Sequence, residues 1–203
     1  MTGSLRIGRS LARVLALAAV LVPGPGRGAN LYTIDPRFGR IEFTVSHLGL
    51  FTSHGDFRLF DSALAIDEAH PERTRITVVV DSGSVDMAWP NAVELLRSAA
   101  YFDVADHPHV RFSSTAVVPE ASGHYLVRGM LEIRGVTRPL ALDAALIDRH
   151  TDPATHGEVA DFVVQGQLLR SAFGMTADPV FISDRVQIRI DARIQLVHPQ
   201  HAG

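Results

Sequence analysis

The stretch Val186-Gln187-Ile188-Arg189-Ile190-Asp191-Ala192-Arg193-Ile194-Gln195-Leu196 alternates apolar and polar residues without a break. A period of two places successive side chains on opposite faces of a β-strand. One face of this strand is therefore apolar, and the other is polar or charged. Such a strand is typical of a sheet that has an apolar interior on one side and water on the other.

Strand-like composition recurs along the chain, with turn residues between the segments. The expected strands are residues 40–47, 55–66, 75–81, 109–117, 125–133, 140–147, 162–169 and 180–196, the last of which is a candidate for a bend or a division. About eight antiparallel strands are enough to close a barrel with room for side chains or for one ligand. The sequence therefore predicts an all-β protein, an antiparallel β-barrel of about eight strands.

Two segments predict connections rather than long strands. Residues 134–139 form an expected hairpin, because Gly135 can adopt a positive φ and Pro139 fits a strand start where no ladder donor is needed. Residues 91–100 are rich in helix formers and follow Pro90-Asn91, which supplies turn and capping chemistry. We expect a short helix there, with Val93 near Leu96, that covers or flanks one end of the barrel.

The first 29 residues differ from the rest of the chain. Three arginines precede the apolar run 14–22, and a Pro/Gly-rich segment, 23–28, follows it. This order is typical of a secretory signal peptide, and the run is shorter than the roughly 20 residues that span a bilayer. We expect a signal peptide over residues 1–29, cleaved near Gly28 or Ala29, and a single periplasmic or secreted domain over residues 30–203. An uncleaved amphipathic or anchoring segment is the alternative.

Composition narrows the function classes. With 203 residues, of which 46% are hydrophobic, the chain can bury a large core. The formal charge of -3 becomes -7 once the four arginines of residues 1–29 are removed, which gives no electrostatic basis for binding nucleic acid. The chain contains no cysteine, so disulfides, thiolate metal sites and thiol catalysis are excluded.

Sequence motifs for catalysis are missing. The chain has no G-x-S-x-G, no H-E-x-x-H, no P-loop and no dinucleotide glycine pattern. Scattered Ser, His and Asp residues can still converge in space, so an enzyme remains an alternative without a motif to support it. Four histidines, His47, His54, His107 and His109, lie near strand ends, but no third ligand accompanies the His107-Pro108-His109 pair. We predict neither a catalytic residue nor a metal site.

The parity of the expected strands turns a set of mostly apolar side chains inward. These residues are Phe43, Val45, Ile76, Val78, Val80, Phe112, Tyr125, Val127, Leu131, Ile133, Leu142, Leu146, Val164, Val186, Ile188 and Ile190. A dry core and a ligand cavity explain this pattern equally well.

Several segments, taken together, resemble the YceI-like family of exported lipid-binding domains. The similar segments are Tyr32-Thr33-Ile34-Asp35, Ile41-Glu42-Phe43-Thr44-Val45-Ser46-His47-Leu48-Gly49, Leu96-Arg97-Ser98, Tyr101-Phe102-Asp103-Val104, His107-Pro108, Val110-Arg111-Phe112-Ser113-Ser114-Thr115, Gly129-Met130-Leu131-Glu132-Ile133-Arg134-Gly135-Val136-Thr137-Arg138-Pro139, Arg170-Ser171-Ala172-Phe173-Gly174-Met175 and Ser183-Asp184 with Val186. They cover nearly all of residues 31–196 in the family's order.

The resemblance implies a lipocalin-like β-barrel whose apolar channel holds a polyisoprenoid or another long-chain amphiphile, such as an isoprenoid quinone. It implies no required cofactor other than such a bound lipid. His47, Arg97, Arg170 and Ser171 are candidate polar contacts in the channel or at its mouth, because they lie in family-like motifs at turns. The alternative for Arg97 and Arg170 is a structural role in which they bind carbonyl groups.

The expected ligand-binding residues are therefore these four together with apolar residues of the channel. The apolar residues are Phe43, Val45, Ile76, Val78, Val80, Phe112, Leu131, Ile133, Leu142, Val164, Val186, Ile188 and Ile190. The interpretation also allows transient membrane contact and a homodimer. Two alternatives stay open: an enzyme that acts on a bound isoprenoid or quinone, and an envelope interaction module with a filled core.

Overall fold

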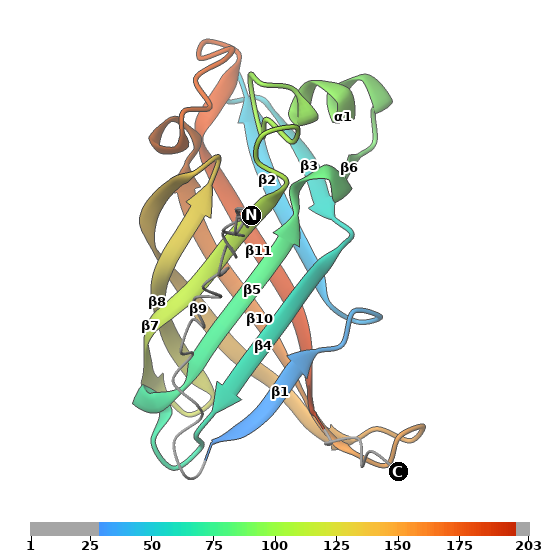
Figure 1. Cartoon of the computed structure of the whole chain (residues 1–203), viewed down its shortest axis with the longest axis vertical. Helices are drawn as coiled ribbons and strands as arrows, with labels where there is room; N and C mark the ends of the chain where they lie inside the picture. The colour runs from blue at the N-terminus through green and yellow to red at the C-terminus, as the bar shows by residue number, and fades with distance from the viewer. Residues whose placement is uncertain (1–28, 198–203) are drawn as a thin grey trace, which may run out of the picture.

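A computed structural model describes residues 29–197, which form one β-barrel with a short helix at one end (Figure 1). The strands are β1 (Asn30–Ile34), β2 (Arg40–His47), β3 (Phe51–Phe57), β4 (Phe60–Ile66), β5 (Arg75–Asp81), β6 (Val85–Met87), β7 (His109–Ala121), β8 (His124–Ile133), β9 (Val136–Thr151), β10 (Glu158–Leu169) and β11 (Ile182–Leu196). The α-helix is α1 (Pro90–Arg97), and the 3-10 helices are η1 (Pro71–Arg73), η2 (Ser82–Ser84) and η3 (Arg170–Phe173). The expected signal peptide lies almost wholly outside the described residues.

Eight strands close the ring in the order β1-β4-β5-β7-β8-β9-β10-β11, because β1 pairs with β11 as well as with β4. All of these pairings are antiparallel, as expected. The long strand β11 has two neighbours on the same side: Ile194 pairs with Ile34 of β1, whereas Ile190 pairs with Ile41 of β2. Strands β2, β3 and β6 therefore extend the sheet along one half of the barrel only (Figure 1).

The alternating face of β11 is confirmed. Val186, Ile188, Ile190, Ala192 and Ile194 line the interior, and the strand runs without division from Ile182 to Leu196. Its pairing with β2 shifts register between Ile182 and Val186. Leu196, at the strand end, is exposed.

The expected hairpin joins β8 to β9 through two residues, Arg134 and Gly135, with φ of 53° and 69°. Positive φ at both positions is typical of the type I′ turn, which suits the twist of paired strands. Pro139 lies inside β9 rather than at its start, which corrects the expectation. Pro139 has no backbone N–H to donate. This is tolerated because β10 pairs with β9 only as far as Leu142, so no strand beside Pro139 on the β10 side needs that hydrogen bond.

The segment expected as one strand over residues 55–66 is two strands, β3 and β4. The chain turns between them, where the backbone N–H of Arg58 donates to the Ser84 carbonyl and that of Leu59 donates to Ser84 Oγ. Strands β1 and β6 are further elements that the alternation did not reveal. Strand β1 closes the ring and strand β6 extends the sheet beside β3. The predicted fold class does not depend on either strand.

Helix α1 begins at Pro90 and ends at Arg97, three residues earlier than expected. The expectation of capping by Pro90-Asn91 is wrong, because the N-cap is Trp89, whose side chain offers no capping hydrogen bond. Pro90 takes the first helical position, where its missing N–H costs nothing. Among residues 29–197, no helix is long and apolar enough to cross a membrane.

The two ends of the barrel differ in their elements. The α1 end carries helix α1, the β2–β3 turn and the loop between β10 and β11 (Figure 1). The β1 end carries β1, residues 67–74 and the β9–β10 loop. At the β1 end, Asp152 is buried and accepts hydrogen bonds from the backbone N–H groups of Ala154 and Thr155, and these bonds hold the pKa of Asp152 below its usual value.

Candidate functional site: the barrel lumen

A cavity of about 810 Å³ occupies the interior of the barrel. Ligand pockets in proteins are usually about 300–1,000 Å³, so this volume suits a large ligand. The lining reaches from Trp89 and Leu95 at the α1 end to Glu68 and Thr151 at the β1 end. The cavity is therefore an elongated channel along the barrel.

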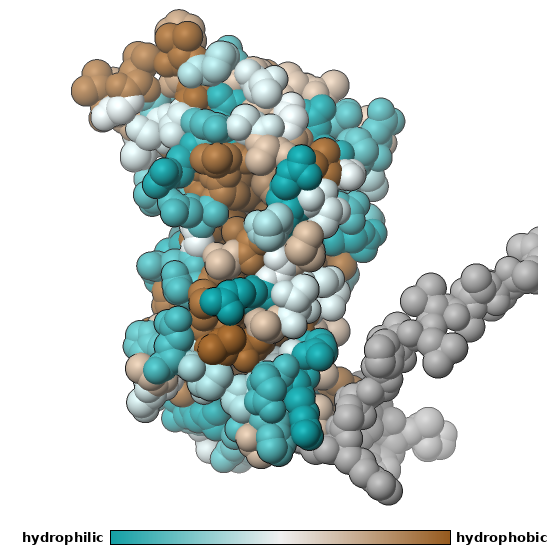
Figure 2. Space-filling view, turned by 90° about the vertical axis from the view of Figure 1, so that its left-hand side faces the viewer, coloured by the Kyte–Doolittle hydropathy of each residue, from teal (hydrophilic) through white to brown (hydrophobic). Residues whose placement is uncertain are grey.

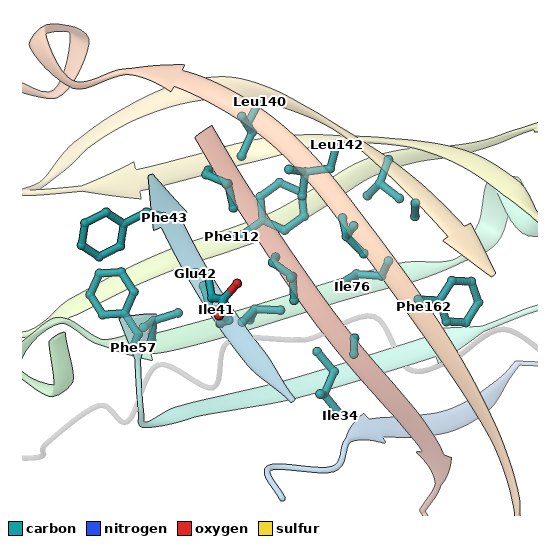
Figure 3. Close-up of a pocket in the computed structure, with 18 of the residues that line it drawn as sticks. Ile34, Ile41, Glu42, Phe43, Phe57, Ile76, Phe112, Leu140, Leu142 and Phe162 are labelled. Carbon is teal, nitrogen blue, oxygen red and sulfur yellow. The ribbon is translucent and has the colours of Figure 1, made fainter. Parts of the chain in front are cut away.

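Apolar side chains form the middle of the channel wall. Figure 3 shows Phe43, Phe112, Ile76, Leu142 and Phe162, contributed by five different strands, around the space. Because each strand turns alternate residues inward, every strand presents an apolar stripe to the same space. The arrangement suits a long apolar ligand.

Two inward glycines explain why large rings do not fill the channel. A Cβ added at Gly129 would overlap the ring of Phe112 and lie 2.6 Å from the Ser113 carbonyl oxygen. A Cβ at Gly55 would overlap the ring of Phe43, and Gly55 pairs with Phe43 across β2 and β3. Each ring lies over the glycine, in the space that a side chain at the glycine position would otherwise fill. Aromatic residues commonly cover strand glycines in this way.

All the apolar residues expected to bind a ligand lie on the channel wall, and so do His47 and Arg170. The apolar ones are Phe43, Val45, Ile76, Val78, Val80, Phe112, Leu131, Ile133, Leu142, Val164, Val186, Ile188 and Ile190. The lumen is hollow, so the choice between a dry core and a cavity is decided for this chain. Contact of these residues with a ligand stays a prediction.

Arg170 is buried, and its donors are taken up by the protein itself. The guanidinium donates to four backbone carbonyls, those of Ser183 at 3.0 Å, Met175 at 2.8 Å, Ala177 at 2.6 Å and Ile182 at 2.9 Å. These bonds hold the β10–β11 loop at the α1 end. The geometry favours the structural role for Arg170.

Arg97 and Ser171 are not part of the channel wall. Arg97 Nε donates to the Gly83 carbonyl at 3.1 Å, and Arg97 also pairs with Glu94 on its own helix. The backbone N–H and the hydroxyl of Ser171 donate to the two carboxylate oxygens of Asp184, which lowers the pKa of Asp184. Both side chains therefore stabilise turns outside the lumen.

His47 differs from the other three predicted polar contacts. It lies on the channel wall, where β2 meets both β3 and β11, and its Nε2 atom is buried without a hydrogen-bond partner in the described part of the chain. A buried unpaired polar atom costs about 1–3 kcal/mol. Of the four candidates, His47 alone combines a place on the wall with an unpaired polar atom.

The channel wall changes character between its two ends. At the α1 end the lining includes Met87, Trp89, Leu95 and Leu96. At the β1 end it includes Asp67, Glu68, Arg149, His150 and Glu158. One opening is thus bordered by apolar side chains and the other by charged ones.

Asp148, His150 and Asp161 form a group whose potential metal-ligand atoms lie within 4.8 Å of one another. Asp161 already accepts two hydrogen bonds from Arg193, at 2.7 and 2.9 Å, and these bonds lower its pKa. A guanidinium on the same carboxylate opposes a cation there. His47, His54, His107 and His109, the histidines singled out from the sequence, are not members of this group.

Comparison with known proteins places the chain in a family. Residues 32–194 match the family model of the YceI-like domain. The chain belongs to the YceI-like family. The UPF0312 protein of Serratia proteamaculans is 34% identical over 166 residues, which cover 81% of this chain and 85% of that protein. Protein YceI of Salmonella arizonae is 31% identical over 176 residues, which cover 86% of this chain and 91% of that protein.

Solved structures confirm the fold of this YceI-like domain. BcnA of Burkholderia cenocepacia superposes with a TM-score of 0.71 at 20% identity, covering 79% of this chain and 98% of BcnA. A polyisoprenoid binding domain from Saccharophagus degradans gives a TM-score of 0.58 at 14% identity, covering 82% of this chain and 98% of that domain. At these identities the likeness establishes the barrel architecture.

Sequence reasoning missed part of the lining of this YceI-like barrel. Ala92, Leu95 and Leu96 of α1 line the channel, whereas Val93 is buried beside them. Their spacing of three and four residues places them on one helical face, and this signal was available in the sequence. The charged lining at the β1 end comes from loops and strand ends, whose side-chain directions alternation does not predict.

Proposed function

We propose that this YceI-like barrel is an exported binding protein that holds a polyisoprenoid or a similar long-chain amphiphile, such as an isoprenoid quinone, in its lumen. One observation carries the proposal: an elongated cavity of about 810 Å³ with an apolar wall. The description of the Saccharophagus degradans relative as a polyisoprenoid binding domain supports the choice of ligand class.

The apolar wall can supply ample binding energy. Burial of each methylene-sized group contributes about 0.8 kcal/mol, so a long isoprenoid gains more in gross terms than the ceiling of about -18 to -21 kcal/mol for any net affinity. The cost of ordering the chain and competition from the membrane offset the excess. A barrel that encloses such a chain is expected to release it slowly unless its mouth opens.

We further propose that the protein carries its ligand without transforming it. The middle of the described wall is formed mainly by Phe, Val, Ile and Leu side chains, which offer no general acid, base or nucleophile. Glu42, which Figure 3 also labels, forms an ion pair with Arg40. Export rests on the pattern of residues 1–29 in the sequence, and the mass of the mature protein tests it.

Native mass spectrometry of protein purified without detergent tests the function. We expect an adduct that solvent extraction releases as an isoprenoid or other long chain, with a mass that stays unchanged on long incubation with the protein. Protein that is bare, and remains bare after incubation with polyprenyl lipids, would refute the proposed function. A change in ligand mass would favour the enzyme instead.

Two variants on the same strand supply the matched control. Ala144 of β9 is buried on the channel wall, whereas Ala141 points outward and is exposed. Ala144→Trp is expected to reduce lipid occupancy at least several-fold by filling the lumen, and Ala141→Trp to leave occupancy unchanged. Equal occupancy in the two variants would mean that the adduct is bound elsewhere.

A further inference from the structure

Seven exposed apolar residues surround the opening at the α1 end, and we refer to them as the apolar rim. They are Leu48 and Leu50 of the β2–β3 turn, Phe51 at the start of β3, Trp89 and Leu95 at α1, and Val180 and Phe181 of the β10–β11 loop. Figure 2 shows hydrophobic side chains projecting from the end of the molecule that lies at the top of both views. Single exposed apolar residues need no explanation, but a contiguous group of large ones marks an interaction site.

The three segments of the rim are held beside one another. The backbone N–H of Leu48 donates to the Phe181 carbonyl at 3.1 Å, which joins the β2–β3 turn to the β10–β11 loop. Tyr101, which follows α1, donates to Asp178 of the β10–β11 loop at 2.9 Å. The rim is therefore one composite surface rather than three separate tips.

The apolar side chains at the β2–β3 turn are exposed although a hairpin turn at these positions does not require them. Leu48 has a φ of 52°, in the left-handed region that favours glycine or asparagine and penalises a bulky residue. Its side chain is nevertheless exposed, as are those of its neighbours Leu50 and Phe51, which are 77% and 70% exposed. A strained, exposed leucine gains nothing from the core, and such positions cluster at functional sites.

The rim is continuous with the apolar wall of the lumen. Trp89 and Leu95 are exposed to solvent and also line the channel, so apolar surface runs from the outside into the cavity. Of the charged residues beside it, Glu94 forms an ion pair with Arg97, and Asp184 accepts hydrogen bonds from Ser171. Charged residues such as Glu68, Arg149 and Glu158 border the opposite opening, so only the α1 end matches an apolar partner.

We propose that the apolar rim is a membrane-docking surface, which inserts into one leaflet of a lipid bilayer and aligns the lumen with the acyl chains. A bilayer suits this surface better than a second copy of the chain does, because the side chains project from separate turns around an opening. Tryptophan is enriched at the level of lipid headgroups, and Trp89 lies in the rim. The proposal rests on the proposed function for the nature of the cargo, whereas docking itself is tested without cargo.

Flotation with phosphatidylcholine vesicles tests the proposal, using the protein as isolated, with the same N terminus in every variant. The rim variant Leu50→Ser/Phe181→Ser alters two residues that do not line the channel. The control Leu59→Ser/Ile147→Ser removes apolar side chains that are 60% and 63% exposed but lie outside the rim. We expect vesicle binding of the rim variant to fall about tenfold or more, and that of the control to change less than about twofold.

Trp89 provides a second readout, because it is the only tryptophan of the chain. We expect its fluorescence to shift to the blue with vesicles and to be quenched by bromine-labelled acyl chains, and both effects to shrink in the rim variant. Because the seven rim residues are all uncharged, adding phosphatidylglycerol or salt is expected to change binding little.

The proposal is overturned if the rim variant binds vesicles like the wild type, or if the control loses as much binding. It is also overturned if the wild type ignores vesicles while sedimentation shows a dimer that the rim variant abolishes. Vesicle binding by a protein that carries no lipid would refute the proposed function and leave docking intact. A lipid-loaded protein that does not bind vesicles would refute docking and leave the proposed function intact.

Discussion

The phenol of Tyr101 donates a 2.9 Å hydrogen bond to Asp178 Oδ2, across 77 residues of sequence. Tyr101 is buried and lines the channel at the α1 end. Burial raises the pKa of Tyr101 to about 12, and the hydrogen bond to Asp178 contributes in the same direction. The bond ties the segment after α1 to the β10–β11 loop, so it holds two sides of the opening together.

Tyr101→Phe is therefore expected to accelerate exchange of a bound lipid several-fold, because the opening loses this tie while the ring keeps its packing. The loss of one hydrogen bond should lower the free energy of unfolding by about 1 kcal/mol. Transfer of a fluorescent lipid from protein to acceptor vesicles measures the exchange rate. Tyr125→Phe, which also alters a tyrosine of the wall, is the control, and equal rates in the two variants would contradict the role of the Asp178 bond.

Arg170→Lys should lower the melting temperature markedly and leave lipid occupancy unchanged at temperatures well below it. A lysine cannot replace a guanidinium that donates to four carbonyls, so buried acceptors lose their partners at a cost of about 3 kcal/mol. Calorimetry and native mass spectrometry check the two outcomes. Arg185→Lys, at an exposed position, should change neither. Loss of lipid without loss of stability would instead make Arg170 a ligand contact.

Asp161 makes the stability of the fold depend on pH. Arg193 donates two hydrogen bonds to its carboxylate, and these bonds hold the pKa of Asp161 below the usual value. A carboxyl group with a lowered pKa in the folded state contributes stability above its unfolded pKa of about 4, and that contribution is lost as the pH falls through the folded value. Asp161→Asn should cost about 1 kcal/mol at neutral pH and weaken the acid dependence. Urea unfolding at several pH values measures this, with Asp143→Asn, at an exposed position, as the control.

Ala160→Phe is expected to shorten the longest lipid that the protein retains, without abolishing binding. Ala160 is buried on the channel wall near the β1 end, where it pairs with Ile194. A ring there blocks the far end of the channel, whereas the α1 end stays open. Competition between polyprenyl lipids of graded length, read by native mass spectrometry, shows the shift. Unchanged length selectivity would mean that the ligand does not extend to this end.

The sequence predicted the strands whose two faces differ strongly, and it missed all or part of the strands that are short or whose inward residues are small. Strand β3 turns Ser53 and Gly55 inward, and Phe51, which shares their face, is exposed at the strand end, so the inward face of β3 carries only a weak apolar signal. Gly55 is small because the ring of Phe43 lies over it, a contact between strands that one segment alone cannot reveal. Strand β1 was missed because it is five residues long and follows the Pro/Gly-rich segment directly.

The same limit applies to the site. Parity placed Phe112 and Ile188 on the channel wall, because the direction of a strand side chain follows from its position. It could not place Arg97, whose helix turns it toward the Gly83 carbonyl, outside the lumen. Residues at turns and helix ends depend on tertiary contacts, and those contacts also create the apolar rim.

The pairing of β1 with β11 has a consequence for how the molecule is made. Tyr32 and Leu196 are neighbours in the finished ring, so the barrel cannot close until nearly the last residue of the domain is available. Contacts between such distant positions are slow to form, and until then the strand edges stay open. Closure of the lumen therefore requires both β1 and β11, and a chain that lacks β11 would have neither a closed ring nor a place for cargo.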